Sequence, residues 1–572
     1  MKWIFFLLLL LKLTIVCADP ETKKTSSPDS VKFDYSIFGQ VPVQNEGRIK
    51  PLDSLLREAI WTVTGKSSWT KRDQQTGKVL KKYLPIELVL AIEFKELNWQ
   101  EEPLIECSYD PILEQLQLSK NRLFCSYNEI KNNEWFRETI QTITWREDPT
   151  VNIDKPIKSK LESEAQSLYQ RFQWLEAIGN RNLANFVPDT EKNKPWLSLH
   201  QKLPYSEEIQ KELNAQYQKI GESWMAGDPE TFRKYSEKFA QLLKTLQPTF
   251  YPQETILLQE YRYNQVSPFQ KALLFYGLAI FFYSFGFKWT RFKWLAHFCL
   301  ILGFATHSWG IYQRVIISGR APVSNMYESM IFFGWSAIAF GIIFELIYRK
   351  GWCGFAAAIC GATVQIITDN VSLNPNLPVL EPVLKSVYLT YHVLLMMVSY
   401  SAFGISLVFS HLFLFTSIFK PEKKELLKDL DTYNYRIIQL GCVGIIFGIF
   451  LGAVWANESW GRYWAWDPKE TWALITFLSY LAILHGRVTN WWKALGSAVG
   501  SLLSFGVLLM TYYGVNFFLV GKHSYAGASA DTPIPPSIAI YAVVEAFVLL
   551  AVWVQNFLRN PKTPAEPIEL HR

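Results

Sequence analysis

WANESWGRYWAWDPKETW, residues Trp455 to Trp472, is the stretch that decides the fold. It holds five of the 22 tryptophans of the 572-residue chain in eighteen positions, and it lies between two long apolar runs. Tryptophan is enriched where helices leave a membrane, so the density alone is typical of an aromatic belt. A belt needs no fixed order and no embedded Asp467, Lys469 or Glu470. A surface for a flat apolar ligand with anionic edges needs both stacking faces and polar groups, and the stretch offers both.

Apolar runs of membrane-spanning length surround this stretch. A spanning helix needs about twenty apolar residues, with a range of roughly 17 to 25. From Phe269 onward, nine runs are candidate spans, at residues 269–287, 294–316, 326–347, 352–368, 388–418, 435–456, 470–486, 494–518 and 536–557. The sequence therefore predicts an all-α polytopic membrane protein with about nine transmembrane helices, in a membrane domain over residues 266–558.

Basic residues mark alternate ends of these spans. They stand at 288, 291 and 293, at 349 and 350, at 420, 423, 424 and 428, at 487 and 493, and at 559 and 562. Lysine and arginine are enriched in cytoplasmic loops, so these positions face inward. The tryptophan stretch then faces outward with the N-terminal segment, and residues 559–572 form a cytoplasmic tail. The net charge of +6 comes largely from these loops, and no basic face indicates nucleic-acid binding.

The N-terminal part is predicted to be exported. Residues 1–18 carry a basic start, an apolar core and a small-residue end, which is typical of a signal peptide. Residues 19–265 then form an extracytoplasmic domain that is mostly helical, with apolar periodicity over 161–177 and 206–245. A Gly47 turn and a helix from Pro51 are expected. Cys107 and Cys125 could pair in one disulfide, and the segment shows no catalytic or metal-ligand cluster.

Six of the eight histidines fall in the membrane domain, where an imidazole is costly unless it is paired or ligating. His392 opens its span and His523 follows the eighth, so both are predicted at the level of the tryptophan stretch. Two imidazoles at one depth, with indoles between them, suit axial ligation of haem iron. His485 lies at the inner end of its span.

The partner of His485 stays open at this stage. His297 matches its depth, whereas His307 lies nearer mid-membrane by rise per residue. His411 has no evident partner. Among the seven cysteines there is no C-x-x-C arrangement, which argues against a dithiol redox centre and against covalently attached haem.

Together these motifs resemble one family. WGRYWAWDPKETWA from Trp460 is similar to the WWD signature of the haem-handling proteins of cytochrome c maturation, in the CcsA branch, also called ResC. YHVLLMMVSYSAF from Tyr391, ALITFLSYLAILHGR ending at Arg487 and GVNFFLVGKHSYA from Gly514 resemble the family's three histidine-bearing segments, in the same order. GRAPVSNMYES from Gly319 is similar to the loop that precedes the next span in that family. The resemblance covers roughly residues 300–530.

The resemblance implies a ligand and a site. His392 and His523 would be axial ligands of an outer haem b, a transiently bound substrate, and His485 would belong to an inner haem site. Its second ligand would be His307, His297 or a histidine of a partner protein. Indole faces would hold the porphyrin while Asp467 and Arg462 orient its polar edges. The residues expected to contact haem are Trp455, Trp460, Arg462, Trp464, Trp466, Asp467 and Trp472.

The implied activity is cytochrome c biogenesis in the bacterial inner membrane. The chain would be a component of a haem–apocytochrome c ligase that joins haem vinyl groups to the thiols of a C-x-x-C-H peptide on the outer side. The implied partners are a CcsB or ResB-type membrane protein, apocytochrome c and thiol-reducing proteins. Two alternatives remain: a haem exporter or chaperone without ligase activity, and a haem-free membrane subunit or transporter.

Overall fold

The computed structural model describes residues 32–72, 78–120, 122–147, 160–191, 194–246, 251–370, 373–377, 379–380, 384–519, 521 and 536–559. The expected signal peptide, His523 and all but the first residue of the expected cytoplasmic tail lie outside these residues. The chain divides into two compact units. One runs up to Pro268 and includes residues 310–320 and 374–380, and the other holds the remaining residues of the predicted membrane domain.

The N-terminal unit is mostly helical, with three two-stranded antiparallel sheets among its described residues. Its helices are α2 (Ser36–Gly39), α3 (Leu52–Thr64), α4 (Pro85–Glu93), α5 (Asp110–Gln115), α6 (Tyr127–Lys131), α7 (Glu134–Glu147), α8 (Lys160–Gly179), α9 (Glu207–Met225), α10 (Pro229–Leu246) and α11 (Glu254–Val266). Its strands are β1 (Pro42–Asn45), β2 (Arg48–Pro51), β3 (Trp69–Arg72), β4 (Val79–Tyr83), β5 (Ile105–Glu106) and β6 (Phe124–Cys125).

Local signals explain where these elements begin and end. Glu46 and Gly47 both have positive φ, at 49° and 76°, and form the predicted turn between β1 and β2. α3 begins at Leu52, directly after Pro51, where the helix was predicted to start. The prediction of a helix over 206–245 is wrong in its continuity, because the structure has two helices there. The helix breaks at Gly227, whose φ is 70°, and Asp228 caps the next helix by accepting from the amide of Thr231.

The two cysteines of the N-terminal unit lie together. Cys125 pairs with Ile105 in the β5–β6 ladder, and the amide of Cys107 donates to the carbonyl of Leu123 at 2.9 Å. Both side chains are buried, and both cysteines are free thiols in the structure. The structure thus brings together the pair whose bonding the sequence left open.

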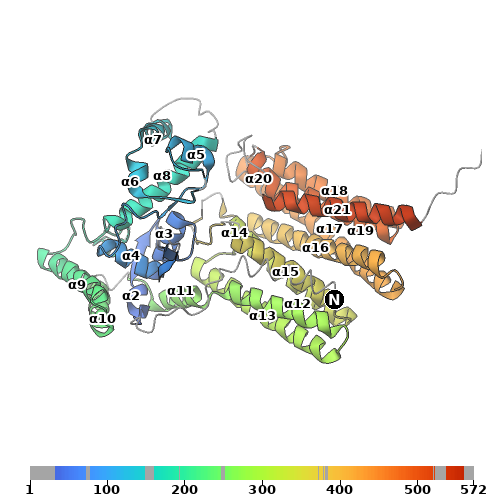
Figure 1. Ribbon diagram of the computed structural model, residues 1–572, viewed down its shortest axis with the longest axis horizontal. Helices are drawn as coiled ribbons and strands as arrows, with labels where there is room; N and C mark the ends of the chain where they lie inside the picture. Colours follow the sequence, from blue (N-terminus) through green and yellow to red (C-terminus); the bar gives the residue numbers. More distant parts are fainter. Residues whose placement is uncertain are drawn as a thin grey trace, which may run out of the picture. The chain divides into compact units, whose positions relative to one another are not determined.

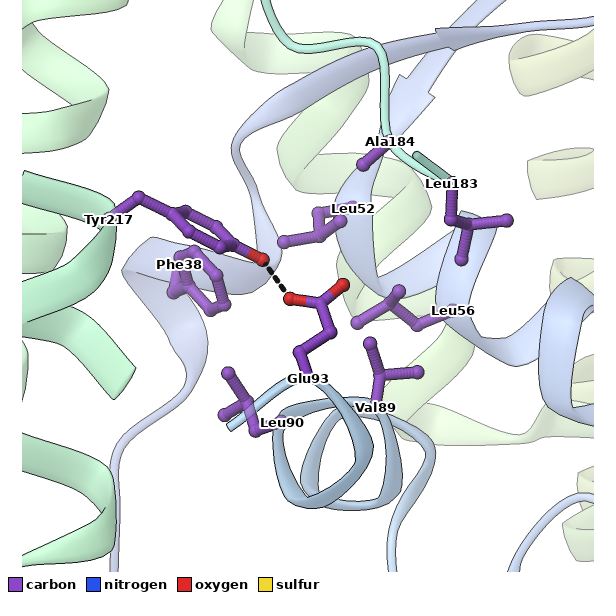
Figure 2. Close-up of a pocket in the computed structure, with 9 residues that line it drawn as sticks. All are labelled: Phe38, Leu52, Leu56, Val89, Leu90, Glu93, Leu183, Ala184 and Tyr217. Carbon is purple, nitrogen blue, oxygen red and sulfur yellow. Dashed lines mark hydrogen bonds between the residues drawn. The ribbon is translucent and has the colours of Figure 1, made fainter. Parts of the chain in front are cut away.

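A carboxyl group is buried in the core of the N-terminal unit. Glu93, at the end of α4, lines a cavity of about 10 Å³ whose other walls are mainly apolar (Figure 2). One carboxyl oxygen accepts from the hydroxyl of Tyr217 on α9 at 2.5 Å, while Leu52 and Leu56 lie beside the group. Burial raises the pKa of Glu93 to about 7, and the bond from Tyr217 only partly opposes this.

This burial predicts a pH-dependent stability. Because the pKa of Glu93 is raised in the folded state, its contribution is fully present below the ordinary glutamate value and is lost as pH rises to about 7. Relative to Glu93→Gln, the wild-type unit should lose on the order of 3 kcal/mol between pH 5 and pH 8. Hydrogen exchange of α4 and α9 amides in the full chain measures this. If the stability of the wild type and that of Glu93→Gln changed with pH in the same way, the raised pKa of Glu93 would be contradicted.

The second unit is a bundle of long helices that run alongside one another (Figure 1). They are α12 (Pro268–Gly286), α13 (Thr290–Ser318), α14 (Met326–Tyr348), α15 (Trp352–Asn370), α16 (Val387–Phe419), α17 (Lys424–Trp460), α18 (Pro468–Val488), α19 (Ala494–Leu509) and α21 (Pro536–Arg559). A π-helical turn, η2 (Met510–Gly514), and α20 (Val515–Phe518) continue α19. The last turns of α13 belong to the N-terminal unit.

Nine helices of the described residues are long and apolar enough to cross a membrane, which confirms the predicted class and number. Apolar side chains such as Trp294, Phe447 and Phe450 are 59–74% exposed, as expected for a surface that faces lipid. One helix extends well beyond its predicted span, 435–456. α17 begins at Lys424 and runs for 37 residues, or about 55 Å, which is longer than a hydrocarbon core.

The two ends of the bundle differ in chemistry. At one end, which we call the basic end, Lys350 pairs with Asp429 at 2.6 Å and Arg487 with Asp431 at 2.8 Å. These ion pairs occupy the charged extension of α17. The other end holds the tryptophan stretch, and we call it the tryptophan end. Helix ends meet there through polar side chains, such as Ser386 and Glu458 at 3.0 Å.

Candidate functional site

A short loop joins α17 to α18 at the tryptophan end. α17 continues to Trp460, where Gly461, with φ of 73°, ends it in the left-handed conformation. α18 begins at Pro468, a position that suits proline because the amide there has no helical partner. The loop is therefore residues 461–467, and the expected loop of 455–472 is too long, since its outer residues are helical.

The five tryptophans have different exposures. Trp455 is 5% exposed and packs edge-to-face on Trp460, with ring centroids 4.8 Å apart. Trp464 and Trp466 are perpendicular at 5.8 Å, and Trp466 is 72% exposed. Trp472, on the first turns of α18, is half-buried. Trp466 therefore offers the largest free aromatic face, whereas Trp455 belongs to the packed interior.

The backbone of the loop is held in an unusual conformation. Trp466 has φ of 57°, which is rare for a large side chain and costs energy unless its surroundings impose it. The carboxylate of Glu470 imposes it by accepting from the amides of Ala465 and Asp467, at 2.8 and 3.3 Å. Strain of this kind is concentrated at functional sites.

Asp467 and Arg462 were expected to orient polar edges of a ligand. Arg462 is exposed in the loop and available for this. Asp467 is 8% exposed and serves as the N-cap of α18, accepting from the amide of Lys469 at 3.0 Å. Gly521 lies against it, because a Cβ at that glycine would be 2.7 Å from Oδ2 of Asp467. Gly521 therefore lies against the last residue of the loop.

His392 lies on α16 and faces α17. Its Nδ1 is 2.7 Å from the carbonyl oxygen of Gly448, and its ring contacts Gly452. Gly452 precedes the end of α17 by eight residues, or about 12 Å. His392 is therefore deeper in the bundle than the level of the loop that its sequence position predicts. Its ring is partly exposed.

The structure separates the candidates for an inner site. His485, near the basic end of α18, is exposed, and its Nδ1 bonds to the carbonyl of Leu481 on its own helix. His307 is 1% exposed and contacts Phe269 and Tyr276, near the tryptophan end of α12. Within the described residues, His307 is therefore not brought to His485.

Two other histidines are held by carboxylates. Nε2 of His297 lies 3.4 Å from Glu345, whose Oε1 also accepts from the amide of Gly351. Nε2 of His411 lies 3.2 Å from Glu545 on α21. The sequence left His411 without a partner, which is wrong, since α21 supplies one. A carboxylate-bound imidazole of this kind joins neighbouring helices.

Sequence reasoning missed a polar cluster beside the loop. The ammonium of Lys469 donates to Asn516 at 2.9 Å and lies 5.9 Å from the ring of Tyr512. The hydroxyl of Tyr512 in η2 bonds to Ser329 on α14 at 2.7 Å. A lysine inside the WWD motif was the available signal. The π-helical turn that aims Tyr512 has no clear sequence signature, although such turns are frequent at functional sites.

Comparisons with known proteins identify a family model and several relatives. The sequence model described as cytochrome C assembly protein matches residues 323–523. Protein NrfI of Wolinella succinogenes is 30% identical over 518 residues, which are 86% of this chain and 54% of NrfI, so the chain spans about half of that relative. Cytochrome c biogenesis protein CcsA of Trieres chinensis is 32% identical over 297 residues, 45% of this chain and 95% of that protein. CcsA of Guillardia theta is 38% identical over 240 residues, 37% and 79% of the two chains.

Proposed function

Because this chain belongs to the CcsA family of cytochrome c biogenesis proteins, we propose that its tryptophan end receives haem b as a substrate and presents it to apocytochrome c. His392 and His523 are the axial ligands in this proposal, and the loop of residues 461–467 holds the porphyrin. The tryptophan end and the N-terminal unit face the outer side of a bacterial cytoplasmic membrane. The concentration of lysine and arginine at the basic end supports this orientation.

One contact carries the proposal. Gly521 packs on Asp467, so the backbone arrives at the tryptophan loop two residues before His523. The other ligand, His392, lies on α16, whose first residues bond to the end of α17. The exposed indole of Trp466 on the same loop supports the proposal, because it offers a flat apolar ligand a free stacking face.

The proposed chemistry asks mainly for positioning. Each thiol of the C-x-x-C-H peptide adds its sulfur to the inner carbon of a vinyl group and its proton to the outer carbon, so no external oxidant or reductant is consumed. Such an addition is favoured when the reactants are held in one geometry. Trp466 supplies a stacking face, and Arg462 supplies a cation for the propionate carboxylates.

An inner site is part of the same proposal. His485 lies on the exposed side of α18 near the basic end, and it retains the imidazole needed to ligate haem before transfer. His297 and His307 are engaged elsewhere within the chain. We therefore assign the second inner ligand to a membrane partner of the CcsB type, which packs against α18.

Co-expression tests the activity. In cells that lack other cytochrome c maturation genes, the chain with a CcsB-type partner should produce covalent haem on a C-x-x-C-H reporter, measured by haem staining in denaturing gels. Trp466→Ala should lower the yield, and Trp491→Ala, which removes an 83% exposed indole at the basic end, should not. Haem-loaded chain without covalent product would instead indicate a carrier. Colourless protein would indicate a haem-free role.

A further inference from the structure

Three glycines of α17 form a seam against α16. Gly444, Gly448 and Gly452 are spaced by four residues and therefore lie along one face of the helix. A Cβ would lie 2.3 Å from Oγ of Ser399 at the first, and 2.7 Å from Sδ of Met396 at the second. Small residues at this spacing let two membrane helices approach closely.

The third glycine of the seam contacts a proposed ligand. A Cβ at Gly452 would lie 2.7 Å from both Cε1 and Nδ1 of His392, closer than side-chain carbons approach in proteins. The ring of His392 is flat and inflexible, so it could not yield as the end of a methionine can. The position of the His392 ring therefore requires that residue 452 has no side chain.

One turn away, the backbone of α17 fixes the ring's tautomer. Nδ1 of His392 is 2.7 Å from the carbonyl oxygen of Gly448. A carbonyl oxygen can only accept, so the proton of this bond belongs to Nδ1. In the neutral imidazole the lone pair is then on Nε2, the nitrogen that a metal ligand must use.

We infer that Gly448 and Gly452 are positioning residues for His392, and this inference rests on the proposed function. The carbonyl of Gly448 selects the tautomer and orientation that present Nε2 to haem iron. Gly452 provides the space in which the ring adopts that orientation. Loss of a group that hydrogen-bonds to a metal-ligating side chain commonly lowers metal affinity by about 10- to 100-fold.

The inference predicts different effects for three alanine substitutions on one seam. Gly452→Ala displaces the ring and should weaken low-spin haem binding about tenfold, with recovery in added imidazole. Gly448→Ala keeps its carbonyl, and the nearest atom to its Cβ is Sδ of the flexible Met396, so the spectrum should be retained. Gly444→Ala is the packing control, because it contacts Ser399 and not His392.

Absorption spectra and imidazole titrations of the purified full chain separate the outcomes. His392→Ala is the reference, and an unchanged spectrum in that variant would remove the proposed function itself. If His392→Ala changes the spectrum but Gly452→Ala does not, the positioning inference alone is overturned. It is also overturned if Gly444→Ala loses haem equally, since close packing would then explain both.

A second measurement needs no substitution on the seam. In wild-type protein labelled with ¹⁵N-histidine, with His392→Ala used for assignment, Nδ1 of His392 should carry the proton in the haem-free state. The opposite tautomer would overturn the inference even if Gly452→Ala failed to accumulate.

Discussion

Replacement of both His392 and His523 with alanine is expected to abolish the low-spin haem b spectrum of the purified chain. The wild-type protein from haem-replete cells should be coloured, with two imidazoles on the iron. The single variants should retain part of the haem in a high-spin form, because one ligand and the loop remain. Absorption and electron paramagnetic resonance spectra of the wild type and the three variants measure this.

His200→Ala is the control for the loss of an imidazole, because His200 lies in the N-terminal unit, where no haem contact is proposed. That variant should keep the full wild-type spectrum. Equal haem content and an unchanged spectrum in the double variant would refute ligation by these two histidines. If the wild type were colourless, the haem proposal as a whole would fail.

Arg48→Ala should strongly destabilise the N-terminal unit. The guanidinium of Arg48 on β2 donates to both oxygens of Glu260 on α11, each at 2.8 Å, and the Glu260 side chain is only 4% exposed. Glu58, which is also bonded to Lys50, lies 3.7 Å from Arg48. Removing Arg48 leaves the buried carboxylate of Glu260 without its cation, which costs about 3–5 kcal/mol, whereas Glu58 keeps Lys50. Thermal unfolding or protease resistance of the full chain measures the loss.

An exposed pair provides the matched control. Arg233 and Glu237 on α10 are 63% and 51% exposed, so Arg233→Ala should change stability by less than about 0.5 kcal/mol. The double substitution Arg48→Met with Glu260→Leu should recover much of the loss, because no lone charge is then buried. Similar melting temperatures for Arg48→Ala and Arg233→Ala would show that the buried network does not stabilise the unit.

Much of the membrane unit could be predicted from local sequence because the bilayer constrains each helix separately. A span must satisfy its own backbone hydrogen bonds and present about twenty apolar residues, so length and composition locate it. The predicted spans at 326–347 and 352–368 end within two residues of α14 and α15. The first turns of α17 are charged, so the apolar run predicts where the span begins but not where the helix begins.

The histidines show what local sequence could not supply. His411 and Glu545 are 134 positions apart, and only the packing of α21 on α16 brings them to 3.2 Å. His307 and His485 are both intramembrane imidazoles by sequence, yet different helices surround them. Rise per residue estimates depth along one helix, but it does not say which face of that helix meets which neighbour.

By itself, the sequence determined that this chain is a helical membrane protein of the CcsA family with a tryptophan loop between two spans, since hydrophobic length and motif order are properties of the chain. Only the tertiary structure decided that Trp455 is interior and Trp466 exposed, that Asp467 caps α18, and that His392 bonds to Gly448. The contact of His392 with Gly448 and the burial of Trp455 depend on how closely neighbouring helices approach, and that distance is set by side chains on both.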